Sequence, residues 1–140
     1  MTTIDLAETK SRVRAVSFYL FSALSLLLLW LSMARPESDF LRGAWLGLTF
    51  TAALNLLPIV RWLRPHSAMG RLLDDDSVRE HRRMACTAGF WAGVAAAFAV
   101  AITTEFVTTI TPFDAVPVVA TASIAAALLC FATLELRAQR

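Results

Sequence analysis

Four long stretches without a charged side chain constrain this chain more than any other feature. Residues 15–34, 43–60, 84–104 and 115–134 contain no Asp, Glu, Lys or Arg over 20, 18, 21 and 20 positions. A bilayer core about 30 Å thick needs about 20 apolar residues in a helix that rises about 1.5 Å per residue. The stretches are continuously apolar rather than alternating, which favours helices over strands. The sequence therefore predicts an all-α polytopic membrane protein, a single domain over residues 1–140 with four transmembrane helices.

The composition agrees with lipid as the main solvent and excludes several classes of protein. Apolar residues make up 57% of the chain and charged residues 17%, against about 45–50% and about 25% in soluble domains. A disordered chain, a disulfide-rich secreted module and an ordinary soluble enzyme are excluded on these values. A net charge of +2 is too small to indicate direct binding of nucleic acid.

The basic residues predict how the protein lies in the membrane. Eleven of the 13 Lys and Arg residues lie in the N-terminal segment, the connection 61–83 and the C-terminal tail, and only Arg35 and Arg42 lie elsewhere. The positive-inside rule then places both termini and the loop 61–83 in the cytoplasm. Because Arg greatly outnumbers Lys and Ala is abundant, we expect a bacterial inner (cytoplasmic) membrane. The first span is expected to be a retained anchor, since its apolar run exceeds the roughly 7–15 residues of a signal peptide.

Small residues indicate where helices approach one another. In a bilayer, helices associate through close van der Waals contact at Gly, Ala and Ser, because lipid supplies little hydrophobic drive between them. The second span has Gly43 and Gly47 at this spacing. The stripe in the third span consists of Ala85, Gly89, Gly93, Ala97 and Ala101. These residues either close a four-helix bundle or, for the third span, form a homodimer.

Larger polar and aromatic side chains add three expectations about the spans. Asn55 is the most polar residue within any run, and a buried Asn in lipid normally bonds to another helix. Trp30 and Trp45 lie near the outer ends of their runs, as interfacial aromatic residues do. Trp91 lies deeper in its run and is expected to pack inside the bundle.

The loop 61–83 carries the concentrated charge of the chain. Ser77 and Glu80 form a capping-box pair, and acidic residues precede it, so the third helix should begin near Val78 and continue into the membrane. We call residues 74–83 the docking segment, because it is the best candidate surface for a cytoplasmic protein. Its proposed partner-binding residues are Asp74, Asp75, Asp76, Arg79, Glu80, Arg82 and Arg83.

Two chemical alternatives for this side of the membrane stay open. The acidic residues at 74–76 could hold Mg²⁺ against a lipid diphosphate, although such sites usually need a second acidic group along the helix. His66, His81, Cys86 and Cys130 could bind a soft metal, but their spacing matches no metal motif. The sequence has no Gly-rich phosphate loop, no Ser/His/Asp arrangement and no paired carboxylates within a span. We therefore expect a protein that is not an enzyme and holds no metal or cofactor.

Two segments carry a resemblance. Residues 72–83 (LLDDDSVREHRR), followed by Ala85 and Gly89-Phe90-Trp91, and residues 131–137 (FATLELR) resemble a loosely defined group of small bacterial four-span membrane proteins. Members of that group often look paired with a helix-turn-helix regulator. Many of them have Glu at the position of Asp76 and Asn or another polar residue near His81. The resemblance implies a membrane partner that controls a cytoplasmic regulator.

These observations predict a non-enzymatic membrane protein that binds or sequesters a cytoplasmic partner through the docking segment. The alternative is a small transporter or channel subunit, in which homo-oligomerisation through Gly89 and Gly93 builds a pathway around Asn55.

Overall fold

The computed structural model describes residues 3–56, 76–106 and 112–138, and this part of the chain is helical apart from short turns. The prediction of an all-α fold is confirmed. The described helices are α1 (Thr3–Ala34), α2 (Asp39–Leu56), α5 (Asp76–Phe106) and α6 (Pro112–Arg137). The second predicted span, 43–60, starts within α2, and its last four residues lie outside the described part. Residues 61–75 of the predicted loop lie outside it as well.

Three of the described helices are long and apolar enough to cross a membrane. The candidate spans are Ser11–Ala34, Ser77–Phe106 and Asp114–Arg137, which contain the predicted runs 15–34, 84–104 and 115–134. This finding indicates a multi-pass membrane protein. The described part of α2 does not meet the same criterion, because its 18 residues include Asp39, Arg42 and Asn55.

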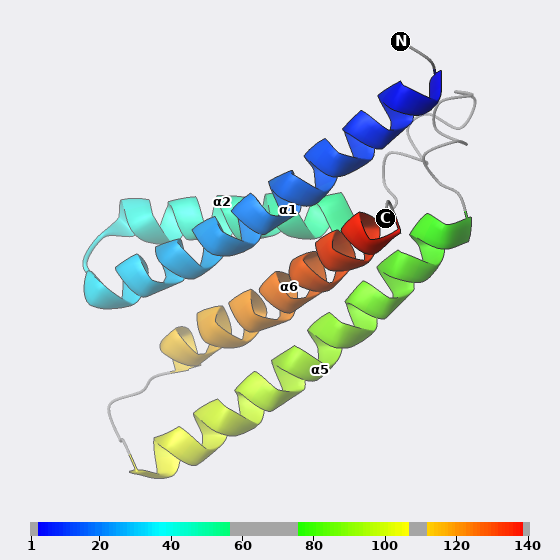
Figure 1. The fold of residues 1–140 in the computed structure, drawn as a ribbon. Coiled ribbons are helices and arrows are strands. Elements are labelled where there is room, and N and C mark those ends of the chain that lie inside the picture. Colours follow the sequence, from blue (N-terminus) through cyan, green and yellow to red (C-terminus); the bar gives the residue numbers. More distant parts are fainter. Residues whose placement is uncertain (1–2, 57–75, 107–111, 139–140) are drawn as a thin grey trace.

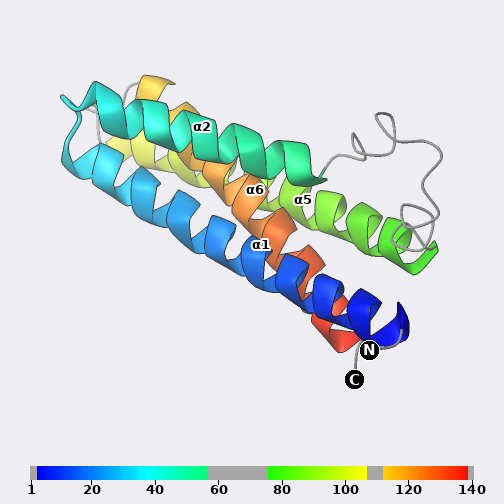
Figure 2. The ribbon, with the colours of Figure 1, turned by 90° about the horizontal axis from the view of Figure 1, so that it is seen from above.

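The helices run alternately up and down, and α6 occupies the middle of the bundle (Figures 1 and 2). Its two large interfaces are with α5 on one side and α1 on the other, while α2 packs on α1 and, less extensively, on α6. Contacts of α5 with α1 and α2 are slight. The start of α1, the start of α5 and the end of α6 lie at the same end of the bundle (Figure 1). The first and last helices of the chain, α1 and α6, therefore lie side by side.

Local signals in the sequence explain the tight connection between α1 and α2. Pro36 cannot continue a helix, and α1 ends two residues before it. Ser38 then precedes α2: its hydroxyl accepts a hydrogen bond from the Leu41 N–H at 3.4 Å, and its carbonyl accepts one from the Arg42 N–H at 3.3 Å. This capping turns the chain back along α1 within four residues.

The core is narrow, and most large apolar side chains face outward. The rings of Phe18 and Phe131 meet edge to face with centroids 5.3 Å apart, and both side chains are buried. Outside this core every described helix exposes large apolar side chains, and most of them lie on α1, α2 and α5. In water such a surface would aggregate, whereas in a bilayer it is the ordinary lipid-facing surface. Examples are Leu20, Trp30, Leu46, Phe50, Phe90, Phe98, Phe106 and Val116.

Two side-chain hydrogen bonds join helices within the bundle. The indole Nε1–H of Trp45 donates to Thr121 Oγ1 at 2.8 Å, and both residues are buried. The indole N–H of Trp45 thus bonds α6 and is not directed outward, as that of an interfacial tryptophan ordinarily is. Between α1 and α6, Tyr19 Oη lies 2.8 Å from Thr133 Oγ1. The Thr133 hydroxyl itself donates to the Leu129 carbonyl, so Tyr19 is the donor of this pair.

Candidate functional site at the end of the bundle

The first turns of α5 have one face against the bundle and one face outward. The helix begins at Asp76, two residues before the predicted start at Val78. Val78 and Ala85 are buried, whereas Arg79, Glu80 and Arg83 are exposed. Helical spacing thus gives the described part of the docking segment an apolar inner face and a charged outer face.

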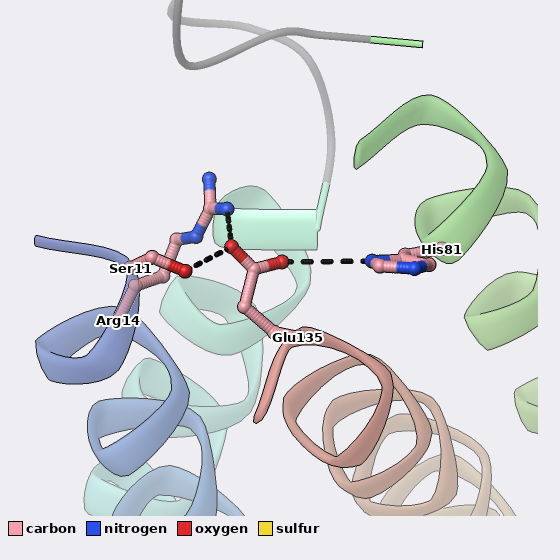
Figure 3. Close-up of polar contacts among 4 residues, drawn as sticks. All are labelled: Ser11, Arg14, His81 and Glu135. Atoms are coloured by element: carbon pink, nitrogen blue, oxygen red, sulfur yellow. Dashed lines mark hydrogen bonds and ion pairs between the residues drawn. The ribbon is translucent and has the colours of Figure 1, made fainter. Parts of the chain in front are cut away.

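A buried carboxylate lies at the centre of this end of the bundle. Glu135 of α6 is 5% exposed, and its Oε1 accepts hydrogen bonds from Ser11 Oγ at 2.6 Å and from Arg14 Nη2. Its other oxygen, Oε2, lies 3.8 Å from Nδ1 of His81. Figure 3 shows the four side chains pointing toward one another from α1, α5 and α6. We call Ser11, Arg14, His81 and Glu135 the Glu135 network.

The network holds its charges in a partly dry environment. Arg14 also lies over the ring of Phe131, 5.2 Å from the centroid, and such a cation–π contact adds to the ion pair with Glu135. Within the described part of the chain, Arg14 Nε, His81 Nδ1 and Glu135 Oε2 are buried without a hydrogen-bond partner. At 3.8 Å the contact between His81 and Glu135 is an ion pair only when the imidazole is protonated. The network therefore joins α1 to α6 through hydrogen bonds and places His81 of α5 beside their shared carboxylate.

The sequence analysis did not identify Glu135 as a site residue. Glu135 follows the fourth charge-free run directly, where a charged residue is ordinarily solvated. The available signal was its register. Positions 121, 125, 128 and 132 follow one another at helical spacing of three or four residues and all are buried, and position 135 continues that face by three more. A carboxylate on the continuation of a buried face predicts a basic partner from a neighbouring helix.

The structure locates five of the seven proposed partner-binding residues. Asp74 and Asp75 lie outside the described residues, and Asp76 is the first residue of α5. Arg79, Glu80 and Arg83 are exposed, and Arg82 is half-buried. The described part of the docking segment is thus a regular helix rather than a loop.

The small residues of α5 meet α6 over part of the predicted stripe. A Cβ added at Gly89 would lie 2.6 Å from the Ser123 carbonyl oxygen and 2.9 Å from Ala127 Cβ, and one added at Gly93 would collide with Ser123 Oγ. Ala85 is fully buried, but Ala97 is exposed. A four-residue repeat drifts about 40° per step on a helix of 3.6 residues per turn, so Ala97 has rotated about 120° away from Ala85. Gly89 and Gly93 are covered within the chain, by α6.

Gly43, Gly47 and Asn55 do not lie at a helix–helix contact within the described chain. A Cβ added at either glycine would meet no atom within 4 Å, and both glycines are exposed. Asn55 is exposed, and its Nδ2 donates to the Thr51 carbonyl of the same helix at 2.8 Å. The expectation that Asn55 bonds a neighbouring helix is therefore wrong for this bundle. The side-chain amide finds its acceptor one turn earlier in α2 instead.

A groove lies on the outer side of α5, and we call it the α5 groove. It has a volume of about 520 Å³. Trp91, which was expected to pack inside the bundle, is 63% exposed and borders this groove. In the described part of the chain the groove is lined by Glu80, Arg83, Met84, Thr87, Ala88 and Trp91.

The described residues offer no cluster for a metal ion. Among residues 3–56, 76–106 and 112–138, no three His, Cys, Asp or Glu side chains lie close enough together to hold one. Of the residues considered for a soft metal, Cys86 is exposed and Cys130 is half-buried, and neither forms a disulfide. His66 lies outside the described part, and His81 belongs to the Glu135 network.

Function has to be inferred from the fold and the site, because the chain resembles no characterised protein in the comparisons below. No model of a protein family matches the chain, and no curated protein and no solved structure matches it.

Proposed function

We propose that this protein is a four-span protein of the bacterial inner membrane that binds a cytoplasmic protein through its docking segment and performs no catalysis. The candidate partner that the sequence resemblance implies is a helix-turn-helix transcription regulator. In this proposal both termini and the docking segment lie in the cytoplasm. Regulation then consists of holding the partner at the membrane, away from its site of action.

The observation that carries the proposal is the two-faced start of α5. Arg79, Glu80 and Arg83 are exposed on a helix whose inner face packs on the bundle through Val78 and places His81 beside Glu135. Charged side chains carried on a preformed helix need less ordering on binding than those of a loop, which favours specific recognition. The two exposed arginines of this face suit a partner that presents acidic side chains opposite Arg79 and Arg83.

The direction of the helices supports a fourth span and termini on one side of the membrane, and the basic residues assign that side to the cytoplasm. Because α1 and α5 start at the same end of the bundle (Figure 1), the chain has to return along the bundle between Ala34 and Asp76. α2 lies along α1 on this return, and its 18 described residues measure about 27 Å at about 1.5 Å per residue. The last four residues of the predicted run lie outside the described part of the chain.

The docking proposal is tested with a photo-crosslinking amino acid in the full-length protein in cells. A crosslinker at position 79 should capture a regulator, whereas one at Phe98, which is lipid-facing on the same helix, should not. Arg79→Glu should reduce capture about tenfold, because a like charge opposite an acidic surface costs more than 1 kcal/mol. Arg137→Glu is the matched control, because Arg137 is an exposed arginine of α6 at the same end of the bundle. Equal capture by wild type, Arg79→Glu and Arg137→Glu would refute docking through α5.

Orientation needs its own measurement. Single-cysteine variants at Thr9 and Arg137 should resist a membrane-impermeant thiol reagent in intact cells, and one at Glu37 should react. The native residues Cys86 and Cys130 are replaced by Ser in this background. Labelling of Thr9→Cys from outside would contradict cytoplasmic termini.

A further inference from the structure

The α5 groove presents its chemical groups in a fixed order along the helix axis. Glu80 lies farthest toward the helix start, Arg83 follows about 4.5 Å deeper, and Trp91 follows about 12 Å deeper again, at about 1.5 Å per residue. Met84, between them, is the first residue of the charge-free run. The groove therefore begins among charges and continues into the apolar part of the span.

The two charged side chains of the groove have no partner among the described residues. Glu80 and Arg83 are exposed, and among the described residues neither side chain forms an ion pair or hydrogen bond. An acid that lies outermost and a base that lies one turn deeper complement a zwitterionic headgroup, in which the ammonium group lies outside the phosphate. We propose that the α5 groove binds phosphatidylethanolamine. The phosphate accepts hydrogen bonds from the Arg83 guanidinium, and the ammonium donates to the Glu80 carboxylate.

The deeper part of the groove suits an acyl chain. Ala88 provides a shallow floor between Met84 and Trp91, which are 45% and 63% exposed. Met side chains adapt to flexible apolar ligands, and Trp combines a large apolar surface with a polar N–H. The groove, of about 520 Å³, is shallow and open to its surroundings, so an acyl chain would lie along it rather than be enclosed by it.

The charge pair discriminates among phospholipids. Phosphatidylcholine carries an ammonium without N–H groups, so it cannot donate a hydrogen bond to Glu80. Phosphatidylglycerol has no positive charge, so its phosphate gains Arg83 but is repelled by Glu80. An ethanolamine headgroup satisfies both side chains, and basic sites at the ends of membrane helices are known binding places for phosphorylated headgroups.

Native mass spectrometry of the purified full-length protein tests this assignment. The probe is an equimolar mixture of phosphatidylethanolamine, phosphatidylcholine and phosphatidylglycerol with identical acyl chains. Wild type should retain phosphatidylethanolamine in preference to both others. Arg83→Gln should weaken its binding about fivefold, the effect of about 1 kcal/mol per basic residue at a membrane surface. Glu80→Gln should abolish the preference over phosphatidylglycerol.

Matched variants on the exposed surface separate a specific site from general lipid contact. Trp91→Leu should weaken binding, whereas Phe98→Leu, an equally exposed aromatic residue deeper on α5, should not. Arg137→Gln should leave the lipid preference intact. Equal retention of the three lipids by wild type, or equal binding by Arg83→Gln and Arg137→Gln, would overturn the proposal. Glu80 and Arg83 belong both to the docking segment and to the α5 groove, so a bound lipid would leave Arg79 as the exposed charge for the protein partner. Because Arg79 does not line the groove, failure of the docking test at that residue and failure of this test are distinguishable.

Discussion

The contact between α5 and α6 predicts that a mutation at Ser123 compensates for one at Gly93. In Gly93→Ala the new methyl group collides with Ser123 Oγ, but it would lie an ordinary 3.4 Å from Ser123 Cβ. Ser123 Oγ at present donates to the Val119 carbonyl at 2.9 Å. Turning it away forfeits a hydrogen bond of about 0.5–1.5 kcal/mol, so Gly93→Ala should destabilise by about 1 kcal/mol relative to an unhindered Gly→Ala change. Ser123→Ala removes the colliding oxygen, so in that background the cost of Gly93→Ala should vanish.

Gly89 should respond differently, because its obstacle is backbone. A Cβ there would lie 2.6 Å from the Ser123 carbonyl oxygen, about 0.8 Å inside the 3.4 Å at which ordinary contact begins. No rotation of a side chain relieves this overlap, and separation of the helices costs about 1–3 kcal/mol. Gly89→Ala should therefore destabilise equally in the wild-type and Ser123→Ala backgrounds. Gly47→Ala, with no atom within 4 Å of the added Cβ, supplies the reference for helix propensity.

The assay is reversible unfolding of the full-length protein by SDS in mixed micelles, followed by tryptophan fluorescence. A double-mutant cycle for Gly93→Ala and Ser123→Ala should give a coupling free energy of about 1 kcal/mol, and the cycle with Gly89→Ala a value within about 0.5 kcal/mol of zero. A cost of Gly93→Ala that persists without the Ser123 hydroxyl would refute the packing described for α5 and α6.

Three further substitutions probe the polar contacts in the same unfolding assay. Glu135→Gln should destabilise the protein by about 1–3 kcal/mol, because Arg14 keeps its charge in a partly buried position without its carboxylate. The double variant with Arg14→Gln should regain part of that loss, and additive effects of the two changes would contradict the ion pair. Trp45→Phe should lower the free energy of unfolding by about 1–2 kcal/mol, since it leaves the buried Thr121 hydroxyl without its donor. A smaller loss in a Thr121→Val background would support that cause. Tyr19→Phe should cost less than Trp45→Phe, because its partner hydroxyl already bonds a backbone carbonyl; the reverse order would contradict the assigned donors.

The distribution of charge predicted the fold well, and the orientation of helix faces was much harder to predict. Three predicted runs coincide with helices because placing a charge in the bilayer core is costly, which confines charges to the ends of the spans. The faces are ambiguous because lipid and protein interior are equally apolar. Trp45 and Trp91 show the difficulty: depth along the sequence suggested an interfacial and a packed residue, and the structure has the first buried and the second exposed.

The site residues also divide into those that the local sequence predicts and those that depend on how the helices pack. The charged outer face of the docking segment could be recognised from its composition, since solvated charge is local information. Glu135 could not, because its partners Ser11 and Arg14 are more than 120 positions away. Only the packing of α1 on α6 brings them together. The helical spacing of Glu135 from Thr121, Ala125, Leu128 and Ala132 is visible in the sequence, but the burial of this face is set by the packing of the helices.

The central position of α6 has a consequence for how the protein is made. A ribosome delivers α1 and α2 first, and these two can pair as a hairpin in the bilayer at once. α5 arrives next, but its extensive contact is with α6, so it must wait among lipids with Gly89 and Gly93 uncovered. Assembly is therefore completed by the last helix of the chain, which inserts between two earlier ones. A ribosome stalled before Pro112 would leave α5 as an orphan helix and a natural substrate for membrane quality control.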